Sequence, residues 1–371
     1  MATYYVGPGG NNANSGLSWA LRKLTLAGAE AVVAAGDTVY VGPGTYREQL
    51  TCTISGTLGN PITYIGDYFG HFTDGIGGLV RITASDDDET YQQRDGFDLG
   101  GFNYRSFIGF SVDVSDSNDP AWQHGCFRVS SVIGAVVNNC YMFNGFRGVM
   151  HHAADGFVPG FEVSNCYFDG TIIGISFVDS ANLVNNAAID IYNCIFNNMG
   201  RTIARGILFT RIGGAVVRNC SFIALNNGIR STVALTAGQT MTVNNSMFEK
   251  CQVALFGVSG HAGNIAENYN NFWDCTADRT DVNTGANSIN LPPYRDPRFF
   301  FRLVDNFRLV TPFDLAEYCQ FINLPGVSPP AHDMRGTGTI GAHRDWGPLE
   351  YDPTLLTASG GIPRSRLIGG V

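Results

Sequence analysis

Residues that could do chemistry recur in four short segments of the chain, each containing a glycine followed by apolar residues. Their ionisable side chains are Arg147, His151, His152, Asp179, Arg205, Arg211 and Arg230. Arginine can hold a carboxylate through paired hydrogen bonds, and histidine can remove a proton near neutral pH. Such groups would suit the cleavage of an acidic polysaccharide, with Arg205, Arg211 or Arg230 on a sugar carboxylate and one histidine as the base.

The same residues also fit a face without catalytic activity, because alternate positions of any solvated strand are polar. His151 and His152 are adjacent, so they point to opposite sides of a strand and at most one can face a substrate. The two lysines of the chain, Lys23 and Lys250, fall in a predicted helix and a predicted turn, which leaves no lysine base here. Aspartates and glutamates do not recur at a calcium-binding spacing. We therefore expect no cofactor; a Ca²⁺ ion without a defined site is the alternative.

A repeat in the sequence indicates which elements position these residues. Asparagines recur at intervals of about 26 residues, each followed by a cysteine or, once, by a serine. They are Asn139, Asn165, Asn193, Asn219 and Asn245. A methionine or phenylalanine comes three residues after each, and a glycine or alanine comes later in the unit. A period of this length is typical of a solenoid, whose repeats bury their apolar residues by stacking on their neighbours.

The residue types indicate a β-solenoid. Val, Ile and Phe dominate each unit and Asn and Gly interrupt it, so one unit predicts one coil of short strands. Like residues then stack at the inter-strand spacing of about 4.8 Å. We expect the asparagines to occupy left-handed corners and to hydrogen-bond to one another. Cys140, Cys166, Cys194 and Cys220 would form an inward column beside the phenylalanines, which makes the fold a parallel β-helix.

The chain is predicted to form one extended domain, because no linker separates differently patterned halves. Residues 1–37 would hold an N-terminal strand and an amphipathic helix over residues 20–35 that caps the open end of the solenoid. Residues 38–347 would form the β-helix. Residues 348–371 fit no coil and are predicted to be an extended tail.

Motifs around the repeat resemble the pectin-lyase-like superfamily of right-handed parallel β-helices. The family's usual opening is matched by Tyr4-Tyr-Val-Gly-Pro-Gly-Gly10, by residues 35–41 and by residues 43–48. Residues 56–64 resemble its second coil, and residues 296–299 and 306–309 are similar to its closing coils. The resemblance implies a single-stranded right-handed helix. It is a poorer guide to activity, because the fold hosts lyases, hydrolases, epimerases, virus spikes and adhesins.

Composition excludes some functions. A net charge of −9 and a pI near 5.2 argue against nucleic acid, which requires a basic face. No segment has the apolar length of a membrane span, and no secretory signal precedes Tyr4. The nine cysteines are predicted to be free thiols, since at least four fall in one stacked column. Trp122 lies in a segment that interrupts the repeat, where it would stack on a sugar ring or cover the sheet.

Together these features predict a structural or carbohydrate-recognition protein of a phage particle, such as a capsid- or tail-attached decoration or spike, without catalytic activity. The tail, residues 348–371, would contact neighbouring virion subunits or a second copy of the chain, and Arg147 and Trp122 would contact a surface polysaccharide. The expected location is the virion, with a secreted protein that has lost its signal as the alternative. The alternative function is a polysaccharide lyase or glycoside hydrolase acting on an acidic polysaccharide.

Overall fold

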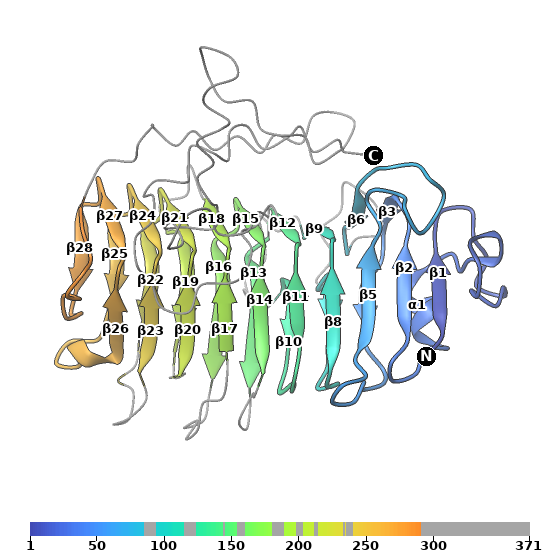
Figure 1. The fold of residues 1–371 in the computed structure, drawn as a ribbon, viewed down its shortest axis with the longest axis horizontal. Helices are drawn as coiled ribbons and strands as arrows, with labels where there is room; N and C mark the ends of the chain where they lie inside the picture. The colour runs from blue at the N-terminus through green and yellow to red at the C-terminus, as the bar shows by residue number, and fades with distance from the viewer. Residues whose placement is uncertain are drawn as a thin grey trace, which may run out of the picture.

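The chain forms a right-handed parallel β-helix in the computed structural model, with its coils stacked along one axis (Figure 1). The structure describes residues 1–84, 94–114, 124–143, 145–153, 160–179, 189–197, 203–210, 214–232, 234 and 240–290, and at 152, 153, 178 and 179 it describes the backbone. Within these residues three parallel sheets, A, B and C, contain ten, nine and nine strands. The predicted all-β parallel solenoid is confirmed.

Sheet A opens each coil. Its strands alternate between buried and partly buried residues, and they pair so that like residues stack, for example Val137 on Val163. Its strands are β1 (Thr3–Val6), β2 (Thr38–Val41), β5 (Ile62–Gly66), β8 (Arg105–Ile108), β11 (Val136–Asn138), β14 (Phe161–Ser164), β17 (Ile189–Tyr192), β20 (Ala215–Arg218), β23 (Met241–Asn244) and β26 (Ile265–Asn268).

A sharp corner leads from sheet A to sheet B. Asn139, Asn165, Asn193, Asn219 and Asn245 occupy it with φ between 50° and 54°, so the predicted left-handed corners are confirmed. Asn193 Nδ2 donates to Asn165 Oδ1 at 3.1 Å, which is one step of the expected ladder. Sheet B consists of β3 (Gly44–Tyr46), β6 (Val80–Ile82), β9 (Ser111–Asp113), β12 (Tyr141–Phe143), β15 (Tyr167–Asp169), β18 (Ile195–Asn197), β21 (Ser221–Ile223), β24 (Met247–Glu249) and β27 (Asn271–Trp273).

Sheet C closes each coil, and its outer face points away from the interior of the helix. Its strands are β4 (Leu50–Thr51), β7 (Phe97–Asp98), β10 (Gly125–Val129), β13 (Arg147–Ala153), β16 (Ile173–Asp179), β19 (Arg205–Phe209), β22 (Asn227–Ser231), β25 (Val253–Phe256) and β28 (Ala277–Thr280). The four segments that carry the predicted site residues therefore lie side by side in one sheet, as β13, β16, β19 and β22.

The predicted columns fill the interior of the helix. Phe196 stacks on Phe168 and on Phe222 with ring centroids 4.6 Å and 4.8 Å apart. The cysteines that follow the corner asparagines are buried, and every cysteine in the described residues is a free thiol. Burial raises the pKa of the Cys140 and Cys194 thiols, so these thiols stay protonated at neutral pH.

The N-terminal cap is less helical than predicted. A 3₁₀ turn, η1 (Trp19–Leu21), and a short helix, α1 (Leu26–Glu30), replace the expected helix over residues 20–35. Lys23 N donates to Tyr5 O, which pulls the chain between the two turns into an extended path along the edge of β1. Thr25 caps α1, with Oγ1 accepting from Gly28 N at 2.9 Å. The edge of the first coil is thus covered mainly by paired backbone.

α1 is attached to the coils by a buried carboxylate. Glu30 pairs with Arg105 of β8 and accepts a hydrogen bond from the Tyr64 hydroxyl at 2.7 Å. The Glu30 and Arg105 side chains are 3% and 0% exposed, so each depends on the other for its charge. At the other end, a second 3₁₀ turn, η2 (Ala262–Asn264), precedes β26.

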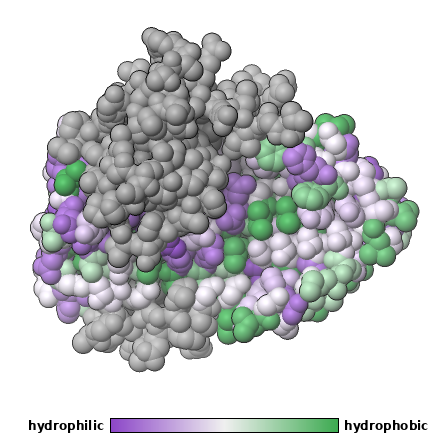
Figure 2. All heavy atoms as spheres, in the orientation of Figure 1, coloured by the Kyte–Doolittle hydropathy of each residue, from purple (hydrophilic) through white to green (hydrophobic). Residues whose placement is uncertain are grey.

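The exposed apolar surface is concentrated near the N-terminal end. Of the large apolar side chains that are exposed in the described residues, all but Ile203 lie at or before Ile76. Figure 2 shows green patches on the same end of the molecule. No helix in the described residues is long and apolar enough to cross a membrane. The predicted closing coils and the tail at residues 348–371 lie outside the described residues.

Candidate functional site

The outer face of sheet C carries two columns of outward side chains. Val149, Ile175, Ile207 and Ile229 belong to the core, so the next residue of each strand points outward. In coil order this column is Asp98, Arg128, Met150, Ser176, Leu208, Arg230 and Phe256. The second column, three residues earlier in each strand, is Gly125, Arg147, Ile173, Arg205, Asn227 and Val253.

His151 does not lie on this face. Its side chain is 0% exposed and its ring packs in the core, with its centroid 5.8 Å from that of Phe177. The prediction that His151 could be the base on this face is therefore wrong. His152 pairs with Val178 and Asp179 pairs with Ala153 in the register, but their side chains are not described. Arg211 and Trp122 lie outside the described residues.

Arg205 and Arg230 lie together on neighbouring coils, as predicted. Burial and the nearby Arg230 charge both lower the pKa of Arg205. Arg230 Nη1 donates a long hydrogen bond of 3.4 Å to Asn227 Oδ1, and its guanidinium lies 4.7 Å from the ring centre of Phe256. No carboxylate of the described residues pairs with either arginine. Two repelling cations without an anion between them form a place where an anion would bind.

An apolar cluster lies beside these arginines. Phe146, Ile173 and Leu208 pack together outside the core, with exposures of 5%, 4% and 7%. Arg147 lies at the edge of this cluster, with its guanidinium 5.6 Å from the centre of the Phe146 ring. The outward columns therefore hold arginines next to a buried apolar cluster.

A second polar cluster lies on the N-terminal part of the same face. Asp95, which is 2% exposed, accepts a hydrogen bond from Gly125 N at 2.7 Å. Its two oxygens lie 3.7 Å from His124 Nδ1 and 3.7 Å from Arg128 Nη1. Asp98 lies beside Arg128 in the outward column. Two carboxyl groups, an imidazole and a guanidinium thus lie near one another, on β7 and β10 or just before them.

The environments of the two carboxyl groups differ. Burial raises the pKa of Asp98, and the Asp95 charge adds to this, while Arg128 and the Gly100 N–H partly oppose it. Asp95 by contrast accepts a backbone hydrogen bond and lies near an imidazole and a guanidinium. Paired carboxyl groups in unlike environments are suited to share acid and base roles.

Sequence reasoning missed this cluster, although one signal could have found it. The outward residue precedes the glycine in Arg147-Gly148 and in Arg205-Gly206. Asp95-Gly96 repeats the pattern. Phe127 pairs with Phe97 on one side and with Val149 on the other, so Asp95 has the position on its coil that Arg147 has on a later one. The same rule, applied to the earlier coils, predicts Asp95 on this face.

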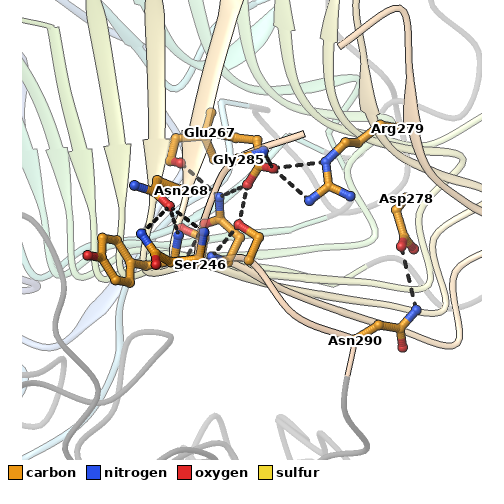
Figure 3. Close-up of polar contacts among 12 residues, drawn as sticks. Ser246, Glu267, Asn268, Asp278, Arg279, Gly285 and Asn290 are labelled. Carbon is orange, nitrogen blue, oxygen red and sulfur yellow. Dashed lines mark hydrogen bonds and ion pairs between the residues drawn. The ribbon is translucent and has the colours of Figure 1, made fainter. Parts of the chain in front are cut away.

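A third polar cluster, around Glu267, has a structural role (Figure 3). Glu267 Oε1 accepts from Arg279 Nε at 2.9 Å and Nη2 at 2.6 Å, and Oε2 accepts from Asn270 Nδ2 at 2.9 Å. Gly285 N donates to the same carboxylate at 2.5 Å. Because these bonds occupy both oxygens, Glu267 fastens residues 279–288 to the last described coil rather than facing a ligand.

Among the described residues, no group of three or more His, Cys, Asp or Glu side chains is placed to hold a metal ion. No protein-family model and no curated protein matches the chain. Among solved structures it is similar to a rhamnogalacturonan lyase, with 19% identity and a TM-score of 0.53 over 74% of each chain. It is also similar to a lacto-N-biosidase from Eubacterium ramulus, with 12% identity and a TM-score of 0.56 over 73% of this chain and 56% of that one. The fold is thus the right-handed parallel β-helix of the pectin-lyase-like type.

Proposed function

We propose that this protein binds an acidic polysaccharide along the outer face of sheet C. The observation that carries the proposal is the pair Arg205 and Arg230, two guanidinium groups on neighbouring coils without a carboxylate partner in the described residues. A sugar carboxylate between them would relieve their repulsion and accept charge-assisted hydrogen bonds from both.

The surface around the pair supports a chain of sugars rather than a single small anion. Phe146, Ile173 and Leu208 form a buried apolar cluster beside the pair, which holds the strands that carry the arginines in place. Arg147 lies further along the same face. Two structures similar to this chain, each with a TM-score above 0.5, are named for activities on carbohydrates.

Binding of polygalacturonate, with dextran as the neutral comparison, tests the proposal. We expect polygalacturonate to bind and dextran not to bind, with affinity that falls as salt rises. Arg205→Gln and Arg230→Gln should each weaken binding about tenfold, because each removes one charged hydrogen-bond partner. Arg218→Gln is the matched control, since Arg218 pairs with Asp190 on sheet A. Equal binding by all four proteins would reject the proposal.

The Asp95 and Asp98 cluster favours cleavage of the bound chain as a second candidate function. In hydrolysis, Asp98 would protonate the glycosidic oxygen while Asp95 takes a proton from the attacking water. Reducing ends would report hydrolysis, and ultraviolet absorbance of unsaturated ends would report elimination. Asp98→Asn should lower a hydrolytic rate at least about 100-fold, and the loop variant Asp74→Asn should not. If the unaltered protein forms no product, the cleavage proposal is rejected and binding without cleavage remains.

A place in a virus particle and assembly through residues 348–371 stay predictions from the sequence. The molecular mass in solution of the full chain, compared with a truncation that ends at Trp346, tests the assembly. An assembled full chain and a monomeric truncation are the expected results. Two monomers would reject assembly through the tail.

A further inference from the structure

A small cavity of about 100 Å³ lies at the corner between sheets A and B, away from the outer face of sheet C. The column of corner asparagines ends there. The coil before Asn139 has Gly109 at the corner, with φ of 79°. A Cβ atom on Gly109 would lie 2.7 Å from the Gly66 carbonyl oxygen, so the position accepts no side chain. The cavity is lined by this glycine and by Asn139 of the next coil.

Polar groups without partners line this cavity. Ser111 is 3% exposed, and its buried Oγ makes no hydrogen bond. Within the part of the chain that the structure describes, the Tyr68 hydroxyl and the Asn139 side-chain amide make none either. A buried hydroxyl without a partner costs about 1–3 kcal/mol, and a ligand that bonds to it would remove this cost. These groups offer donors to a carbonyl oxygen.

The rest of the wall is apolar. Leu79 and Phe110 form part of it, together with the rings of Tyr141 and Tyr167, whose centroids are 5.2 Å apart. The hydroxyls of both tyrosines are already used, by Asp169 and Asn197. A cavity of about 150 Å³ holds benzene, so this one suits a group of about four heavy atoms. The ligand group must therefore combine a hydrogen-bond acceptor with a small apolar part.

We propose that this cavity is a subsite for the acetyl group of an acetylated sugar. The carbonyl oxygen would accept from Ser111 Oγ or from the Tyr68 hydroxyl, and the methyl group would pack against Leu79 and the ring of Tyr141. The choice of a sugar as carrier rests on the proposed polysaccharide binding, whereas the preference for acetyl rests on the cavity alone. No lysine or arginine lines this cavity, so it would not attract a free carboxylate as the arginine pair would.

Titration of the full chain by NMR with N-acetylglucosamine and 6-O-acetylglucose, against glucose and glucosamine, tests the proposal. At least one acetylated sugar should bind at millimolar concentration and the unacetylated sugars should not, and the first two arms separate N-acetyl from O-acetyl groups. Tyr68→Phe and Ser111→Ala should each weaken binding about threefold or more, and Leu79→Phe should abolish it by filling the cavity. Ser221→Ala is the control, because Ser221 occupies the same column of sheet B with an equally buried hydroxyl.

Three results would overturn the subsite. If neither acetylated sugar binds more tightly than glucose and glucosamine, the acetyl group is not recognised, and no binding of either acetylated sugar would mean that the cavity holds only water. Full binding by a folded Leu79→Phe variant would place any binding elsewhere. Polygalacturonate carries no acetyl group, so its binding is expected to be unaffected by Leu79→Phe. The failure of one proposal is therefore distinguishable from the failure of the other.

Discussion

At the scale of single residues, the recurring glycines of sheet C are required for space. Gly148, Gly174, Gly206 and Gly228 do not have left-handed backbone, but a Cβ at each would lie 2.4 to 2.7 Å from a phenylalanine ring of the core column. At Gly174 that atom would lie 2.5 Å from Phe196 Cδ1 and 2.7 Å from the Gly206 carbonyl oxygen. Neither the stacked ring nor the paired backbone can move without disturbing the next coil.

Gly174→Ala is therefore expected to lower the free energy of unfolding by about 1–3 kcal/mol, as overpacking does in a dense core. Denaturant titration measures the change. Gly263→Ala is the matched control, because a Cβ at Gly263 meets no atom within 4 Å. If Gly174→Ala is as stable as this control, the core around Phe196 is looser than the structure indicates.

Asp98 should make stability depend on pH. Its pKa is raised by burial above the ordinary value of 3.8. Between 3.8 and this raised pKa, the folded state therefore binds more protons than the unfolded state. The free energy of unfolding must then fall as pH rises through this window. Asn cannot ionise, so the stability of Asp98→Asn relative to the unaltered protein should increase over the same window. Urea titrations at several pH values measure this difference, and parallel profiles would contradict it.

Residue types predicted the inside of the helix better than its outside. The corner asparagines, the cysteines and the phenylalanines each have one role that a repeat reveals. The side of the strand on which His151 lies was harder to predict. Simple alternation along the strand places Arg147 and His151 on the same side. Gly148 and Val149 both face inward, with a Cβ at Gly148 directed at Phe168, so alternation shifts by one position there. A shift of this kind leaves no mark in the periodicity of a short strand.

At the scale of elements, α1 shows why a short helix can be stable. Five residues form too few hydrogen bonds to persist alone, and tertiary contacts supply the rest. Glu48 accepts from Leu26 N at 2.9 Å and from Ala27 N at 3.2 Å, which satisfies the start of the helix. Glu30 at its end pairs with Arg105. Neither contact can be read from local sequence, so the length of the helix was overestimated.

Removing the cation from this buried pair should detach the cap. Arg105→Met leaves the Glu30 carboxylate buried without its charged partner and should cost about 3–5 kcal/mol in the free energy of unfolding. Glu30→Gln combined with Arg105→Met should recover part of the loss, because no buried charge remains. Chemical denaturation of the single and double variants measures the coupling. Additive losses would show that the two side chains do not depend on each other.

The acidic cluster of sheet C was missed for a reason that also lies in the elements. The repeat is visible only from Asn139 onward, because Gly109 replaces asparagine on the coil before it. Tyr64 of β5 pairs with Phe107 of β8, so the chain between these strands is much longer than one repeat. Long insertions hide the period, and with it the register that brings Asp95 and Asp98 beside His124 and Arg128.

At the scale of the whole molecule, each coil contacts only the coils next to it, so stability should decrease from the middle towards the ends. Buried thiols are placed along the axis to report this, from Cys52 near the first coils to Cys251 near the last described ones. Burial raises the pKa of the Cys52 thiol to about 12, and burial of the other core thiols blocks access to them, so these thiols should react slowly with alkylating agents in the native state. Cys275, which is partly exposed, should react first.

Mass spectrometry after brief alkylation at increasing urea concentration would resolve the order in which thiols become exposed. We expect Cys275 and Cys251 to react at lower urea than Cys166 and Cys194, because the central coils are supported on both sides. Protection of Cys166 to the end of the transition would locate the most stable part of the solenoid there. A single midpoint for every thiol would contradict this order, and it would mean that the coils unfold together as one cooperative unit.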